Sequence, residues 1–290
     1  MRKTQRGLLL ISFAILLGAF LYVYVLDKEL ALMFRRYFTE PDYGRRVCEA
    51  DPFGCRYGNR VQEILALFHK GYDEFSMCLS GCTTAQQLFI PVVIAVCGVW
   101  FHRYWHRIGK MAKYLAENRE KALFRIMNRN AVAVCSGFYL AFLLLMILCA
   151  GTCWHLSPYP GAEPCSHLLL DLIPQKFYEE HIIMYYLIIG ILMYLAVPWM
   201  YCMFAQSAVL FCRRGKTAFF MVLGLLLSMI YLSVFGMMKG CFWMLYLSPV
   251  GIYLSYVYHN GQTLLYFLAP VTAYLISVIL RRVYAAGAEF

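Results

Sequence analysis

The chain consists of long apolar runs separated by polar segments. A bilayer core needs about 20 apolar residues in a helix, and six runs meet or approach that length. They cover residues 7–26, 83–101, 131–152, 182–205, 217–238 and 264–280. The pattern predicts an all-α fold, a polytopic transmembrane helical bundle with about six spans that forms a single domain.

One further apolar stretch, residues 241–258, contains Pro249 and Gly251 and ends just before the last run. As a seventh span it would move Arg281 and Arg282 to the outer side. We therefore expect a re-entrant or interfacial helical hairpin, because a broken helix at membrane depth is tolerated where protein or a cavity shields its backbone. Seven spans remain the alternative.

The charges give the bundle an expected orientation. With the N-terminus inside, the inner segments hold 16 of the 26 lysines and arginines but only 3 of the 16 acidic residues. Lysine and arginine accumulate on the cytoplasmic side of membrane proteins. Both termini and residues 102–130 are therefore expected in the cytoplasm, and residues 27–82 form a large extracytoplasmic segment.

Composition supports a membrane protein, since 62% of the residues are hydrophobic and only 14% are charged. The net charge of +10 lies in short segments between apolar runs, which disfavours nucleic-acid binding. Residues 7–26 are expected to persist as the first span, because the run is longer than a signal-peptide core and no small-x-small cleavage site follows it.

Seven of the twelve cysteines fall in the segments expected outside, where an oxidising environment permits disulfides. The plausible local pairs are Cys48–Cys55, Cys78–Cys82 and Cys153–Cys165, although spacing does not establish connectivity. Cys241 is the seventh, so the count is odd. The other five lie in or beside the spans and are interpreted as small apolar residues: Cys97, Cys135, Cys149, Cys202 and Cys212.

No motif indicates catalysis, a metal or a cofactor. Residues 215–217 read Gly-Lys-Thr, but Leu210 stands where a phosphate-binding loop needs glycine. His102 and His106 share a helix face, yet no third ligand is near them in sequence and neighbouring arginines would repel a cation. No ionisable residue falls deep within a predicted span, which disfavours a proton- or sodium-coupled carrier.

The cytoplasmic segment 102–130 is basic and amphipathic, with Ile108, Met111 and Ile126 on its apolar face. Such a segment is typical of a helix lying on anionic lipid. It is equally typical of a docking surface for a cytoplasmic partner. The residue pattern alone does not decide between these two interpretations.

The order of residues around the second span resembles the type-2 permease family of ABC exporters, in its Firmicute form. The positions that carry the resemblance are Pro91, Gly109, Tyr114, Arg119, Phe124 and Arg129. The layout is similar as well: six spans, both ends inside, a large outer segment after the first span and a helical hairpin before the last.

This resemblance implies a permease subunit of the bacterial cell membrane that pairs with a second permease, identical or different. It also implies that a separate cytoplasmic ATPase docks on the 102–130 segment and rocks the spans to export a substrate. The docking residues it implies are Arg107, Lys110, Lys113, Tyr114, Arg119, Lys121 and Arg125. This chain would catalyse no reaction and hold no cofactor.

Two other functions remain open. A non-transporting membrane protein, such as a sensor, an immunity factor or an assembly factor, would act through the outer segment and its disulfides. A membrane-embedded enzyme would need a catalytic cluster, and the sequence shows none.

Overall fold

The computed structural model describes residues 2–39, 75, 78–79, 82–83, 86–112, 119–152, 172–248 and 263–286. All regular structure in this part of the chain is helical. The long helices are α1 (Arg2–Thr39), α5 (Gln86–Ala112), α6 (Arg119–Thr152), α10 (Gly215–Met238) and α13 (Leu268–Ala286). A composite helix consists of α8 (Ile182–Gly190), the π-helical η2 (Ile191–Ala196), α9 (Val197–Ala208) and the 3-10 turn η3 (Val209–Phe211). The short elements are α7 (Gln175–Glu180), the 3-10 helix η4 (Phe242–Leu247) and α12 (Thr263–Tyr266).

Six helices within the described residues are long and apolar enough to cross a membrane. They are Thr4–Val25, Gln86–Arg107, Glu120–Thr152, Ile182–Phe211, Gly215–Gly236 and Leu264–Ala286. Each one contains most of a predicted run, so the described residues confirm the predicted all-helical fold with six helices that could span a membrane. Most of the helices continue past the apolar runs, because charged flanking residues are also good helix formers.

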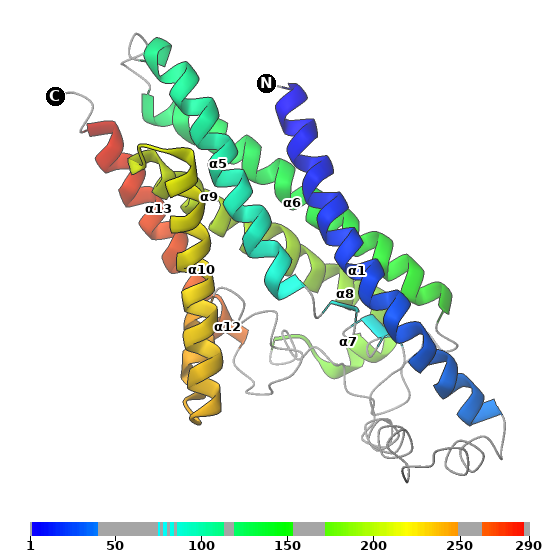
Figure 1. Ribbon diagram of the computed structural model, residues 1–290. Coiled ribbons are helices and arrows are strands. Elements are labelled where there is room, and N and C mark those ends of the chain that lie inside the picture. Colours follow the sequence, from blue (N-terminus) through cyan, green and yellow to red (C-terminus); the bar gives the residue numbers. More distant parts are fainter. Residues whose placement is uncertain are drawn as a thin grey trace, which may run out of the picture.

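The two chain termini lie at the same end of the bundle, which we call the termini end (Figure 1). The short helix α7 and the last residues of α10 lie at the opposite end. Helix α1 packs along α6, α13 along α9, and α10 along α5, while α5 also contacts α9. Helices α5, α6 and α9 are therefore the centre of the bundle.

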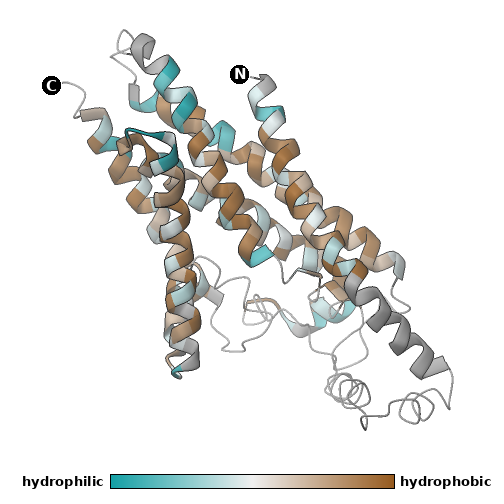
Figure 2. Cartoon of the chain, viewed as in Figure 1, coloured by the Kyte–Doolittle hydropathy of each residue, from teal (hydrophilic) through white to brown (hydrophobic). Residues whose placement is uncertain are grey.

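Hydrophobic residues predominate along the middle of the long helices (Figure 2). Only 18% of the most apolar stretch of α10 is buried inside the bundle, against 56% of the most apolar stretch of α5. Large side chains such as Phe220, Tyr231 and Leu232 on α10 are exposed. A surface of this kind is stable in lipid, which covers apolar side chains at no cost.

Helices α1 and α6 approach each other closely at small residues. Ser12 on α1 faces Gly137 on α6, and a methyl group added at Gly137 would overlap the Ser12 hydroxyl. Ala133 and Ala141, one turn away on either side of Gly137, are also buried. Small residues spaced four apart allow helices to pack tightly where no hydrophobic effect drives their association.

The prolines inside the spans have different structural roles. Pro91 lies within α5, and Pro270 lies in the first turn of α13, where no amide donor is needed. Pro198 is the second residue of α9, which begins directly after the π-helical η2. Because Pro198 has no amide hydrogen to donate to the carbonyl of Tyr194, the regular hydrogen-bond ladder is interrupted there and the helix widens.

The predicted hairpin lies mostly outside the described residues. Its first part contains η4, which packs against α10. There the Met244 side chain fills the space beside Gly236. Residues 249–262 are not described, so the hairpin stays a prediction. In the outer segment 27–82, the beginning continues α1 to Thr39, and residues 40–74 are not described.

Candidate functional site

The segment 102–130, predicted to be a docking surface, is divided between two helices at the termini end. Residues 102–112 continue α5, and residues 119–130 form the start of α6. Arg107 on α5 is exposed, as are Lys121 and Arg125 on α6. Lys121 and Arg125 are four residues apart and therefore share a helix face.

The other predicted docking residues are placed only in part. Lys110 belongs to α5 and Arg119 begins α6, in stretches where the structure describes the backbone alone. Lys113 and Tyr114 lie outside the described residues. The predicted docking residues whose side chains are described are therefore three exposed cations on the ends of two central helices.

Two hydrogen bonds connect the end of α5 to the rest of the termini end. His102 Nε2 donates to the carbonyl oxygen of Cys212, at 2.8 Å, in the turn before α10. Trp105 Nε1 donates to the hydroxyl of Tyr284 on α13, at 3.0 Å. Burial raises the pKa of the Cys212 thiol, which therefore stays protonated. The two hydrogen bonds therefore connect α5 to the turn before α10 and to α13.

A buried polar cluster joins α6 to α9 and α9 to α13. Gln206 Nε2 donates to the carbonyl oxygens of Met127 and Cys202, at 3.1 Å each, and Asn130 Nδ2 donates to Gln206 Oε1 at 3.4 Å. The hydroxyls of Ser207 and Ser277 are 2.9 Å apart. Such bonds inside a membrane bundle fix the register of neighbouring helices.

Replacing Gln206 with leucine is expected to destabilise the protein by about 1–2 kcal/mol, because Asn130 would keep a buried amide without its partner. The measurement is a thermal or denaturant unfolding curve in detergent. The double variant Gln206→Leu/Asn130→Leu is the control, since removing both amides should recover part of the loss. Equal destabilisation by the single and double variants would contradict the role of the pair.

Arg281 is buried, although its place after the last apolar run predicted an exposed side chain. The prediction ended the sixth span at residue 280, but α13 continues to Ala286 and leaves Arg281 only 4% exposed. Its guanidinium lies 4.7 Å from the centre of the Phe124 ring, and its Nε donates to the Ser277 carbonyl at 3.3 Å. An arginine stem packed on apolar surface, with its charge on an aromatic face, is favourable near a membrane boundary.

A second group of contacts surrounds Tyr194 in η2, at the centre of the bundle. Its hydroxyl donates to Gln86 Oε1 on α5. Its ring stacks on Phe142 of α6 with centroids 4.5 Å apart and meets the edge of Phe20 on α1 at 6.2 Å. This π-helical turn is therefore in contact with three other spans, and π-helical turns are frequent at functional sites.

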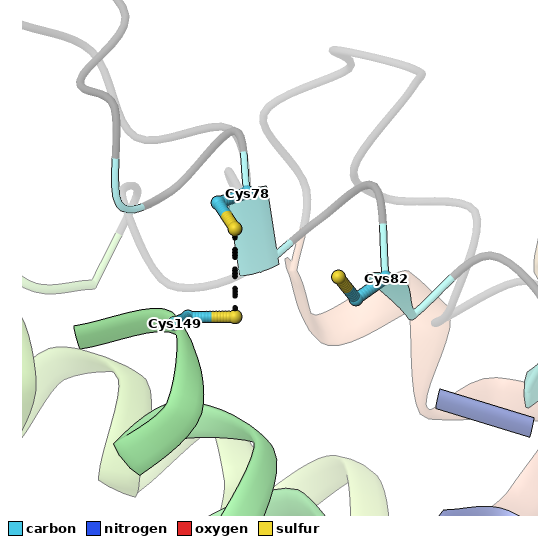
Figure 3. Close-up of side chains that lie close together, drawn as sticks. All are labelled: Cys78, Cys82 and Cys149. Atoms are coloured by element: carbon cyan, nitrogen blue, oxygen red, sulfur yellow. Dashed lines mark hydrogen bonds between the residues drawn. The ribbon is translucent and has the colours of Figure 1, made fainter. Parts of the chain in front are cut away.

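Three of the eight described cysteines form a group that does not match the predicted pairs. Cys78 and Cys82 lie near each other, as expected for a local pair, but Cys149 of α6 joins them, with its Sγ 3.6 Å from that of Cys78 (Figure 3). The disulfides themselves stay predictions, and Cys48, Cys55, Cys153 and Cys165 lie outside the described residues. The sequence feature that could have placed Cys149 near these two cysteines is its position at the outer end of the third predicted span.

The chain matches no protein-family model, no curated protein and no solved structure. Its function must therefore be inferred from the arrangement of its own residues. That arrangement combines an apolar bundle, a cationic surface at the termini end, a π-helical junction at the centre and a thiol cluster at the opposite end.

Proposed function

We propose that the chain is the membrane-spanning permease subunit of an ATP-driven ABC exporter in a bacterial cell membrane. The observation that supports this most is the placement of Arg107, Lys121 and Arg125. They are exposed on the ends of α5 and α6, at the same end of the bundle as both termini. In this proposal the termini end faces the cytoplasm, and a separate ATPase binds there through acidic and polar groups.

In the proposed mechanism the ATPase pushes on the ends of α5 and α6 when it binds ATP. The contacts of His102 and Trp105 carry that movement to α10 and α13, and the spans rock against a second permease subunit. The junction around Tyr194 is where the composite span can bend, because η2 lacks a regular α-helical ladder. Bond chemistry belongs to the ATPase, so this chain is not itself an enzyme.

The test is capture of the ATPase by the charge-reversed chain. Lys121→Glu/Arg125→Glu is expected to weaken co-purification with an ATPase encoded beside the permease gene by at least about tenfold, because two cations facing acidic groups become repulsive. The proteins are co-expressed, extracted in mild detergent and pulled down with and without a non-hydrolysable ATP analogue.

The matched control reverses two exposed cations at the opposite end, Lys176 and Lys239. Lys176→Glu/Lys239→Glu changes the net charge equally and should leave capture unchanged. Equal loss in both variants would show a general effect of charge and would count against the docking surface. Absence of any captured ATPase with the native chain, in every nucleotide state, would reject the permease and favour a non-transporting protein that acts through its outer segment.

A further inference from the structure

Three thiols from two distant parts of the sequence meet at the opposite end of the bundle (Figure 3). The Sγ atoms of Cys78, Cys82 and Cys149 all lie within 4.8 Å of one another. The Sγ atoms of Cys78 and Cys149 are 3.6 Å apart. Cys82 and Cys149 are buried, and Cys78 is partly exposed.

The backbone around these thiols is anchored to the bundle. The Phe75 and Leu79 side chains are fully buried, and the Phe75 ring meets Tyr186 of α8 edge-on, with centroids 5.7 Å apart. The amide of Thr83 donates to the Leu79 carbonyl at 3.2 Å. On the other side, Thr152 Oγ1 donates to the Cys149 carbonyl at 2.9 Å in the last turn of α6. The cluster therefore rests on packed elements, as a binding site requires.

The spacing of the sulfur atoms fits a single metal ion. Zn²⁺ binds thiolate sulfur at about 2.3 Å, which separates the sulfurs of a tetrahedral site by about 3.8 Å. The Cys78–Cys149 separation of 3.6 Å is close to this value and the other two separations do not exceed 4.8 Å, so small side-chain rotations would bring all three sulfurs into the first coordination shell. A disulfide, in contrast, joins two sulfurs at about 2.05 Å and leaves the third thiol unused.

Charge and access favour zinc among thiol-seeking ions. Binding releases three thiol protons and leaves a net charge of −1 for Zn²⁺ but −2 for Cu⁺, and excess buried charge is costly. Tetrahedral zinc needs a fourth ligand, and the partial exposure of Cys78 gives water a route to that position. We propose that Cys78, Cys82 and Cys149 form a three-thiolate Zn²⁺ site with water as the fourth ligand. This inference does not rest on the proposed transport function.

The test uses Co²⁺, which occupies zinc-thiolate sites and has visible absorption that Zn²⁺ lacks. The full chain, purified in detergent and reduced, is titrated with Co²⁺ without oxygen. We expect one equivalent to give a thiolate-to-cobalt charge-transfer band together with tetrahedral absorption, both removed by Zn²⁺. Cys78→Ser, Cys82→Ser and Cys149→Ser should each weaken binding by at least about 100-fold. Cys241→Ser, which replaces a partly exposed thiol beyond α10, should change nothing.

A second measurement uses the native chain and so does not depend on how the variants fold. Alkylation followed by mass spectrometry compares Cys78 with Cys241, with and without Zn²⁺. Protection of Cys78 alone is the expected result. Equal protection of both thiols, no cobalt-thiolate spectrum, or binding that survives all three substitutions would overturn the proposal. A disulfide joining any two of the three cysteines in protein isolated without reductant would overturn it as well.

Discussion

Replacing Gly137 with leucine is expected to prevent the chain from accumulating as a folded, monodisperse protein. A methyl group at this position would overlap the Ser12 hydroxyl and lie 2.5 Å from the carbonyl oxygen of Leu9 and 2.9 Å from the amide nitrogen of Phe13. Two of these atoms belong to the backbone of α1, so no rotamer change can relieve the clash. Helices α1 and α6 must separate, at a cost of about 3 kcal/mol or more.

The measurement is size-exclusion chromatography of the detergent extract, followed by a thermal unfolding curve of whatever remains monodisperse. Gly18→Leu is the matched control, because it places the same side chain on α1 where no atom lies within 4 Å. That variant should express and unfold like the native chain. A Gly137→Leu protein with native elution and native unfolding would show that α1 and α6 do not pack as the structure places them.

The spans could be predicted from sequence because apolar length is a local property. The run at residues 131–152 indicated a membrane helix without any knowledge of its neighbours. Its true start, at Arg119, was missed because hydropathy marks where lipid can cover a helix rather than where the helix begins. Glu120 and Lys121 are exposed at that start, and polar helix residues of this kind carry no signal in an apolar window.

The features that depend on contacts between spans could not be predicted. The burial of Arg281 follows from Phe124 lying against it, and the role of Gly137 follows from Ser12 on another helix. Cys149 was interpreted as a small apolar residue, and only packing brings it to Cys78. The proline at 198 was visible in sequence, but whether it would kink the span or widen it into a π-helical turn depended on what surrounds Tyr194.

Tyr194→Ala is expected to destabilise the bundle by about 3–5 kcal/mol, the largest loss we expect from removing a single side chain. The side chain is fully buried, and its ring loses contact with Phe142 and Phe20 at once. Truncating a large buried aromatic side chain costs this much because the surrounding helices relax only partly into the cavity. Unfolding in detergent, followed by tryptophan fluorescence or by loss of monodispersity, measures the effect.

Tyr194→Phe separates the ring from the hydroxyl. It keeps both ring contacts and removes only the bond to Gln86, so we expect a loss of about 0.6–1.7 kcal/mol, between the average and the maximum for such bonds in a membrane bundle. In a double-mutant cycle with Gln86→Leu, the two losses should be clearly less than additive, because each substitution removes the same bond. Strict additivity would show that Tyr194 does not join η2 to α5. If the cycle holds, Tyr194 connects the π-helical turn to three other spans, which is the arrangement that the proposed rocking movement requires.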